Sequence, residues 1–236
     1  LGAGALPLLA LTMTFASFDW MMSLDPRFFS TIFGVYWFAG GFMSAFAVII
    51  IAAAMTRNDP NGFGHHLSAE HLHSLGKFLL AFTAFWAYIA FDQYFLYWYG
   101  NITEETKFYL DRRVGSWYDL SVALPIGYFA IPFVILLPRA SKRNPLILGF
   151  VAMWILAFHL IDVFWQVMPE SLKAHSPHEL PSGGINLNWM QVVSVVMFAG
   201  VLFGSVLWGW RKYPLIPVKD PRLAESIHHE VDEFGD

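Results

Sequence analysis

Six long apolar stretches dominate the chain, and short segments with charged residues, prolines or glycines separate them. A helix needs about 20 mostly apolar residues to cross a bilayer. Six stretches meet this length, at residues 1–24, 31–56, 74–100, 117–138, 145–168 and 187–210. No strand-like alternation is present. The pattern therefore predicts an all-α, polytopic transmembrane bundle of about six spanning helices at residues 1–212, followed by an exposed tail at residues 213–236.

The connections carry signals that begin and bend helices. Ser68 is expected to cap the third helix, with Glu70 in its first turn. Pro145 suits the first turn of the fifth helix. Pro125 and Pro132 lie inside the fourth stretch, where proline can kink a helix. Because the connections are short, neighbouring helices are expected to run antiparallel.

Composition agrees with a membrane protein and excludes several function classes. Only 14% of the residues are charged, against about 25% in soluble domains. The formal net charge is −4, and no basic patch interleaved with aromatic residues is present, so nucleic-acid binding is not expected. The chain has no cysteine, which excludes disulfides, zinc–thiolate sites and iron–sulfur ligation. An electron-carrying cluster would therefore have to lie on a partner.

The distribution of Lys and Arg predicts an orientation. Nine of the 14 lie on the side that holds the connection around residues 57–73 and the C-terminus. The positive-inside rule makes that side cytoplasmic. The chain begins within an apolar run and without an initiator methionine, so we expect an N-terminal part to be missing.

Tryptophans near the helix ends are typical of an aromatic belt, in which amphipathic rings lie at the headgroup level. Two are near the side predicted to be cytoplasmic, Trp208 and Trp210. Five fall near the opposite side: Trp20, Trp98, Trp117, Trp165 and Trp189.

Ionisable residues inside the apolar stretches are the main functional signal, because a charge in a spanning helix is costly. Four carboxylates and one imidazole fall in the half of the membrane away from the predicted cytoplasm: Asp19, Asp92, Asp119, Asp162 and His159. Asp92 and Asp162 lie about 8 Å from the middle of their helices at 1.5 Å per residue. Carboxylates in such surroundings suit proton exchange near neutral pH.

The helical spacing of these residues is ordered. His159, Asp162 and Gln166 share one helix face, and His73, Lys77, Tyr88 and Asp92 follow one stripe of the third helix. We interpret the group as a proton path whose cytoplasmic mouth is His73 and Lys77. The predicted path consists of Asp19, His73, Lys77, Tyr88, Asp92, Asp119, His159 and Asp162. Buried, satisfied pairs that only lock helix packing remain the alternative.

Metal and haem sites are not predicted. His65, His66, His71 and His73 cluster with Glu70, but their spacing matches no metal-binding motif of known geometry. Haem b needs axial histidines from facing helices, and His159 is the only histidine deep in an apolar stretch. We therefore expect no cofactor that is covalently attached or held by metal ligation in this chain.

Three longer strings resemble a known family. They are FASFDWMMSLDPRFFSTIFGVYWFAGG at residues 15–41, HSLGKFLLAFTAFWAYIAFDQYFLYWYGNITEET at residues 73–106, and WYDLSVALPIGYFAIPFVILLPRASKRN at residues 117–144. Together they resemble the F-type membrane subunit of alternative complex III, a quinol:cytochrome c oxidoreductase. This subunit is also described as quinone-binding subunit 2 and is related to NrfD-like membrane proteins. The resemblance extends over essentially the whole chain.

The resemblance implies a multi-pass, non-redox subunit in the bacterial inner (cytoplasmic) membrane with a cytoplasmic C-terminus. Its implied partners are a C-type NrfD-like membrane subunit, an iron–sulfur subunit and c-type cytochromes. The implied role is proton translocation, with menaquinone or ubiquinone as the candidate ligand of a partial quinone site. Family members have about ten spanning helices, so the six here would be the later ones. The quinol pocket of the C-type relative lies in the earlier helices, which weakens the case for a quinone site here.

Two other functions remain open on sequence grounds. A secondary transporter could use the same buried charges for substrate coupling, although such proteins usually show inverted repeats and broken helices. A purely structural membrane subunit is the third reading. Stoichiometric co-purification with cytochromes and an iron–sulfur protein would distinguish the first function from the other two.

Overall fold

All six predicted stretches form long helices in a computed structural model, which describes residues 2–59, 62–173, 185, 188–213, 216, 221 and 223–227. The spans are α1 (Gly2–Trp20), α2 (Phe33–Met55), α3 (Ala69–Gly100), a composite helix over residues 116–136, α8 (Pro145–Lys173) and α9 (Trp189–Lys212). All six are long and apolar enough to cross a membrane. Among the described residues there are helices and no strand. The predicted all-α fold is therefore confirmed.

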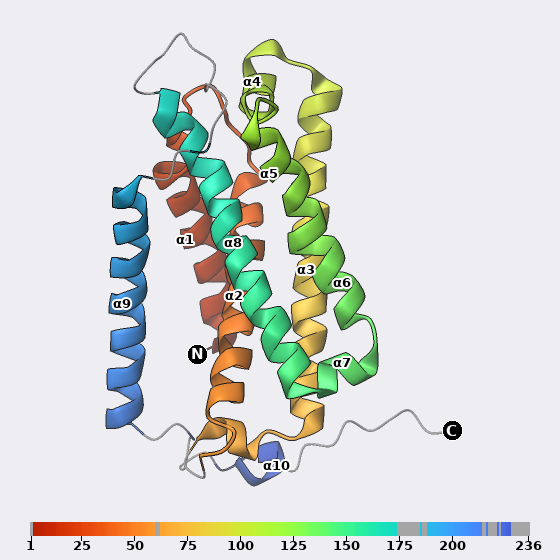
Figure 1. The fold of residues 1–236 in the computed structure, drawn as a ribbon, viewed down its shortest axis with the longest axis vertical. Coiled ribbons are helices and arrows are strands. Elements are labelled where there is room, and N and C mark those ends of the chain that lie inside the picture. Colours follow the sequence, from red (N-terminus) through yellow and green to blue (C-terminus); the bar gives the residue numbers. More distant parts are fainter. Residues whose placement is uncertain are drawn as a thin grey trace.

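Shorter elements lie at the two ends of the spans. Near the end of α3 is α4, and α7 joins the fourth span to α8 (Figure 1). The short elements are η1 (Met22–Leu24), η2 (Phe63–His66), α4 (Thr103–Asp111), α7 (Arg139–Arg143) and α10 (Leu223–Ile227). Most of the predicted tail at residues 213–236, and residues 174–184, lie outside the described residues.

Four of the spans pack into a bundle, and the other two lie at its edge. The bundle consists of α2, α3, the composite fourth span and α8, with α1 packed against α2 and α9 on the outside (Figure 1). Ala39, Met43 and Ala47 of α2 recur every four residues and are fully buried. They belong to one hydrophobic core with Leu79 of α3 and Leu148 of α8. This spacing places them on one face of α2, which is the inner face of the bundle.

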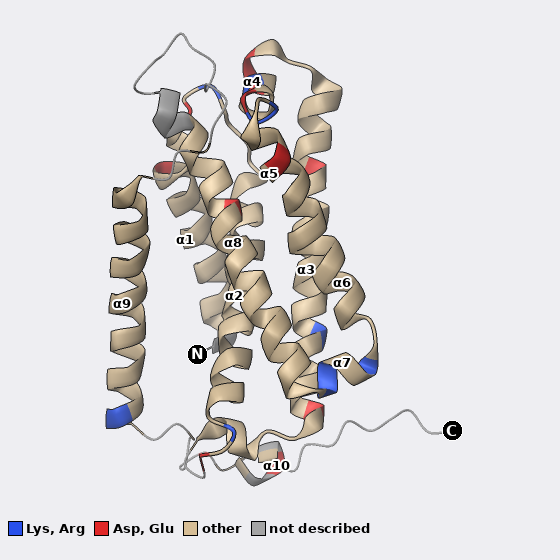
Figure 2. Ribbon diagram, in the orientation of Figure 1, with Lys and Arg blue, Asp and Glu red and all other residues tan. Residues whose placement is uncertain are grey.

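Charged residues concentrate toward the two ends of this bundle, and few lie along the middle of the spans (Figure 2). One exception is Asp162, well inside α8 and buried. The distribution is the one a bilayer requires, because a charged side chain at mid-depth needs partners within the protein.

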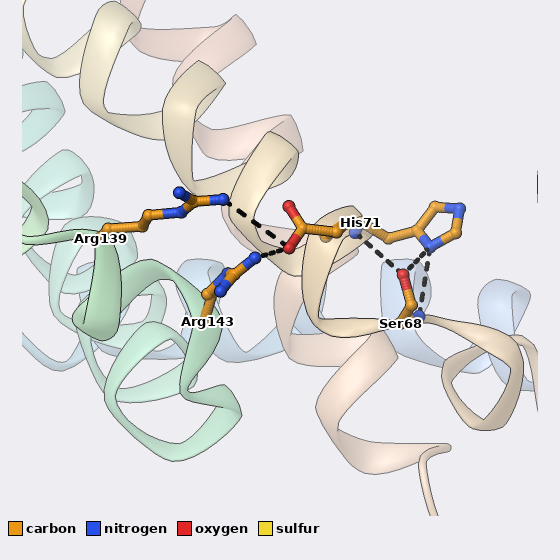
Figure 3. A network of polar contacts seen from close by, with 5 residues as sticks. Ser68, His71, Arg139 and Arg143 are labelled. Carbon is orange, nitrogen blue, oxygen red and sulfur yellow. Dashed lines mark hydrogen bonds and ion pairs between the residues drawn. The ribbon is translucent and has the colours of Figure 1, made fainter. Parts of the chain in front are cut away.

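The start of α3 confirms the predicted cap, although the helix begins before the expected residue 74. The Ser68 hydroxyl accepts the His71 N–H at 3.4 Å, and the Ser68 N–H donates to His71 Nδ1 at 3.2 Å (Figure 3). Glu70 lies in the first turn, as expected. The cap extends α3 by a polar turn beyond the apolar stretch, which is why hydropathy alone placed its start too late.

The fourth span contains a wide turn where two prolines were expected to bend it. It consists of α5 (Ser116–Leu124), η3 (Pro125–Ala130), which is π-helical, and α6 (Ile131–Leu136). The N–H of Ile131 bonds to the carbonyl of Ile126, five residues back. The same pattern would pair the Gly127 carbonyl with Pro132, which has no N–H. Trp154 of α8 supplies the missing donor, with its Nε1 2.7 Å from that carbonyl oxygen.

The predicted position in an aromatic belt agrees with the exposure of some tryptophans and is wrong for others. Trp20, Trp98 and Trp189 are exposed, as belt residues should be. Trp117 is fully buried, and Trp165 donates from Nε1 to Ser121 Oγ at 2.7 Å inside the protein. These two rings are therefore core residues of the α5–α8 contact. Their depth along the helices matched a belt, but depth gives no information about which face a residue occupies.

Candidate functional site

A buried carboxylate is the centre of the candidate site. Asp162 of α8 is 1% exposed, and the Tyr36 hydroxyl on α2 donates a hydrogen bond of 2.5 Å to its Oδ1. Tyr36 is buried as well, so both partners lie inside the bundle. The bond joins two helices whose sequences are far apart in the chain.

One turn away on α8, His159 forms a second bond across the bundle. Its Nδ1 lies 2.9 Å from the hydroxyl of Tyr128, which is on the π-helical turn and fully buried. The other side of the imidazole faces α2, where the ring of Trp37 lies 6.5 Å away. A side chain at Gly40 would come within 2.9 Å of His159 Cε1. Gly40 therefore allows the histidine to fit between the helices, as small residues do at helix contacts in membranes.

Trp86 of α3 links the two hydrogen-bonded pairs. Its ring lies 5.8 Å from that of Tyr36 and 4.3 Å from that of Tyr128. Its Nε1 is buried without a hydrogen-bond partner among the described residues, although the indole lies beside the Asp162 carboxylate. We call Tyr36, Trp86, Tyr128, His159 and Asp162 the interior cluster. Four helical segments contribute to it.

The interior cluster holds a carboxylate with no cation paired to it. Within the described part of the chain, ion pairs form at Asp25 and Glu70, and none reaches Asp162. The Tyr36 hydroxyl donates to Asp162, and the other polar groups close to the carboxylate, the Trp86 indole and the Gln166 amide, are also neutral. A carboxyl in such surroundings can release or accept a proton without breaking an ion pair.

A cavity of about 760 Å³ adjoins the cluster on the side of α3, α4 and α5. Tyr36, Trp86 and Gln166 line it, so the cavity touches the groups around Asp162. Its wall is mainly aromatic and aliphatic. Two buried acceptors in that wall, Oε1 of Gln93 and Oε1 of Gln166, have no hydrogen-bond partner among the described residues. Buried acceptors without a protein partner are commonly satisfied by water or a ligand.

Arg112, also on the cavity wall, fixes the end of α8. It is buried, and its guanidinium donates to the carbonyls of Phe108 at 2.7 Å, Trp165 at 3.0 Å and Gln166 at 2.6 Å. The Trp165 carbonyl precedes Pro169 by four residues, so it lacks the usual helical N–H. Arg112 replaces that donor and holds α4 against α8. Its guanidinium carbon also lies 3.4 Å from the centroid of the Phe108 ring.

Tyr109 closes the cavity on the α4 side. Its hydroxyl accepts a hydrogen bond of 3.1 Å from Nε2 of Gln93. Burial raises the pKa of Tyr109 well above its ordinary value, while the bond from Gln93 and the charge of Arg112 act in the opposite direction. The phenol therefore stays neutral over the physiological pH range and serves as a hydrogen-bonding group.

Of the eight residues of the predicted proton path, only His159 and Asp162 lie in the interior cluster, while His73 and Lys77 lie close to each other near α7. Asp92 and His73 are half-buried, and Asp92 is neither a described partner of Asp162 nor part of the cavity wall. The remaining four are exposed: Asp19, Lys77, Tyr88 and Asp119. On α3 the buried stripe includes Gly76, Trp86 and Gln93. The predicted stripe runs beside it, because Lys77 and Asp92 are each one residue away from a buried position.

Sequence reasoning missed Tyr36, Trp86, Tyr128 and Arg112. The three aromatic residues lie in aromatic-rich stretches, where nothing distinguishes them from packing residues. Arg112 was counted as a loop charge. The available signal was Pro169, because a proline late in a helix leaves a carbonyl that needs a donor from elsewhere.

Comparison with known proteins gives no match: the chain fits no protein-family model and matches no curated protein sequence. Among the described residues, no group of three or more histidine or acidic side chains is placed to hold a metal ion.

Proposed function

We propose that this chain is an integral membrane subunit of a quinol-oxidising electron-transfer complex of the alternative complex III type, and that Asp162 is its proton-exchanging group. The observation that carries the proposal is the buried hydrogen bond between Tyr36 and Asp162, with no cation paired to the carboxylate. The sequence resemblance supports the choice of complex. The chain would contribute proton movement, while redox centres would lie on partner subunits.

The interior cluster has the chemistry that a proton relay needs. A tyrosine hydroxyl both donates and accepts hydrogen bonds, and neutral imidazole has one nitrogen of each kind. Tyr36 and Tyr128 therefore extend the reach of Asp162 and His159 toward α2 and the fourth span. The adjoining cavity has room for water, and the free acceptors of Gln93 and Gln166 can orient it.

The alternative roles make different demands. In a purely structural subunit, a carboxylate without a paired cation would raise the free energy of membrane insertion by about 2.5–3.5 kcal/mol and would serve no function. A secondary transporter would use the cavity for its substrate. Co-purification of cytochromes and an iron–sulfur protein in stoichiometric amounts would support the complex, and a chain that purifies alone and stable would contradict it.

Asp162→Asn tests the mechanism within the assembled complex. Asparagine keeps the shape and can still accept from Tyr36, so assembly is expected to persist. Proton translocation per electron, or turnover under a membrane potential, should fall. Asp92→Asn tests whether the path also includes the half-buried carboxylate of α3, in which case the two variants should show comparable losses.

Unchanged turnover and proton stoichiometry in Asp162→Asn would contradict the relay and favour a packing role. If that variant does not assemble, Tyr36→Phe is the second test. It removes only the hydroxyl that bonds to Asp162, and a relay still predicts reduced proton translocation.

A further inference from the structure

The end of the bundle near α7 carries a concentration of cations that the proposed function does not use. Lys77 and His73 of α3 face α7, which carries Arg139, Lys142 and Arg143. Figure 2 shows Lys and Arg gathered on α7 and on the neighbouring part of α3. We call these five residues the basic corner.

One acidic side chain partly compensates this charge. Glu70 forms an ion pair with Arg143 and lies 4.0 Å from Arg139. The two arginines extend from α7 toward the first turn of α3 (Figure 3). The Glu70 carboxylate is therefore shared by two guanidinium groups. Lys77 and Lys142 remain without a carboxylate partner in the part of the chain that the structure describes.

Lys142 is fixed in place and cannot turn away from the neighbouring charges. It is 5% exposed, and its Nζ donates to the carbonyls of Leu136 at 2.6 Å, Leu137 at 2.9 Å and Pro138 at 3.3 Å. These are the last carbonyls of α6, which have no helical donor. Burial and the nearby charge of Lys77 lower the pKa of Lys142. The two ammonium groups are therefore close enough to repel each other.

Two nitrogens of the basic corner have no hydrogen-bond partner within the described ranges of the chain. His73 Nδ1 and Arg143 Nε are buried without a hydrogen-bond partner among the described residues. Lys77, whose charge acts on His73, is exposed. Buried polar groups normally have partners. Excess positive charge together with nitrogens that lack a partner favours an acceptor-rich anion, and phosphate supplies both negative charge and acceptor oxygens.

We propose that the basic corner binds a phosphate group, supplied by the headgroup of an anionic phospholipid, through Lys77, His73 and Arg143. Lys77 lies within a spanning helix near its polar end, where a lysine can extend its ammonium to the headgroup level. Phe78 is 53% exposed next to it and offers apolar surface to an acyl chain. Basic pockets between spanning helices commonly bind anionic headgroups. This site is independent of the proton relay.

The test uses the full chain, purified in a neutral detergent or within its complex. Phosphatidylglycerol, phosphatidylcholine and inorganic phosphate are titrated separately, and binding is followed by native mass spectrometry and by the midpoint of thermal unfolding. Lys77→Gln should weaken phosphatidylglycerol binding about fivefold, because one cation near an anionic headgroup contributes about 1 kcal/mol. The double variant with His73→Gln should lose more. Lys107→Gln, on α4 at the other end of the bundle, is the control and should bind as the unmodified chain does.

Selective binding of phosphatidylglycerol, weakened by Lys77→Gln, supports the lipid headgroup as the source. Equal protection by inorganic phosphate, with the same sensitivity to Lys77→Gln, supports the phosphate site with a soluble source. Equal affinity of the unmodified chain and the double variant would overturn the site. An equal loss in Lys107→Gln would also overturn it, because it would indicate general charge attraction.

Discussion

Helices α8 and α9 are almost equally apolar, yet they occupy opposite environments. Both are long enough to span a membrane. α8 lies in the bundle and buries Leu148, Val151, Ile155 and Asp162. Helix α9 stands outside, and none of its described residues is buried (Figure 1). Hydropathy therefore identifies a spanning helix without indicating whether it packs against the rest of the chain.

Polar side chains distinguish the two helices. Those of α8 bond to other helices, as Asp162 does with Tyr36 and Trp154 does with Gly127. The serines of α9 bond to their own helix: Ser194 donates to the Met190 carbonyl and Ser205 to that of Leu202. At the start of α9, Gln191 donates to the Met168 sulfur of α8 at 3.5 Å. A polar group satisfied within its own helix needs no neighbour in the membrane. The comparison thus predicts where substitutions will matter.

The largest effect is expected at the end of α8, where Arg112 holds three carbonyls. Arg112→Met removes all three donors and leaves the Trp165 carbonyl unsatisfied beside Pro169. The free energy of unfolding should fall by about 3–5 kcal/mol, as when a buried charged group loses its contacts. Reversible unfolding in detergent measures it.

Arg113→Met is the control for this variant. Arg113 is the next residue but is exposed, and its side chain bonds to the Tyr94 hydroxyl. Its loss should cost less than about 1 kcal/mol. Equal effects of the two substitutions would contradict the role of Arg112 as the anchor of α8.

The same truncation on the two helices gives the most direct comparison. Leu148→Ala leaves a cavity in the core, whereas Leu202→Ala removes a side chain that is 59% exposed. The first should cost about 2–5 kcal/mol and the second less than about 0.5 kcal/mol in the isolated chain. If Leu202→Ala becomes costly only in the assembled complex, α9 packs against a partner. A similar cost for both in the isolated chain would contradict the peripheral position of α9.

Two glycine substitutions test the same difference between the bundle and α9 with the addition of a single methyl group. A methyl group at Gly127 would meet the ring of Phe158 on α8, while one at Gly200 of α9 would meet nothing. Gly127→Ala should therefore destabilise the chain by about 1–3 kcal/mol through overpacking. Gly200→Ala should be neutral or stabilise it slightly, since alanine favours helix. The midpoint of thermal unfolding of both variants, measured in one detergent, tests this difference. A destabilised Gly200→Ala would indicate a neighbour at that face of α9.

An effect no larger than that at Gly127 is expected for Trp154→Phe, which keeps most of the ring and removes the donor to the Gly127 carbonyl. The cost should be about 1–3 kcal/mol at most, the penalty for an unsatisfied buried acceptor. Trp189→Phe on the exposed start of α9 serves as the control and should change stability little. A cost no larger than that of the control would mean that the π-helical turn does not need this donor.

The spans could be predicted because each is a long apolar stretch, and the cap at Ser68 because it is a local feature. Helix α4 could not, since nine residues with several charges resemble a loop. The wide turn at Pro125 was expected only as a bend. Its hydrogen-bond pattern depends on Trp154, which lies in another helix and leaves no trace in the local sequence.

Part of the candidate site could also be predicted, because some of its residues stand out in the local sequence. His159 and Asp162 stand out as ionisable residues in an apolar helix, and their spacing placed them on one face. Tyr36 and Tyr128 became part of the site only through packing of three segments. Asp92 resembled Asp162 in depth, but it lies one residue from the buried stripe of α3. One residue turns a side chain by about 100°, which separates an interior carboxylate from a peripheral one.

The π-helical turn at Pro125–Ala130 also separates two properties of the fourth span: the number of its residues, and which of them face the core. A wide turn stores one more residue than an ordinary turn. Deleting a single residue there would restore regular helix and leave a segment that still spans the bilayer. A deletion within the regular turns of α5 would instead rotate α6 by about 100° relative to the start of the span. Leu136, now fully buried, would leave the core, so a one-codon change would reorient half a helix.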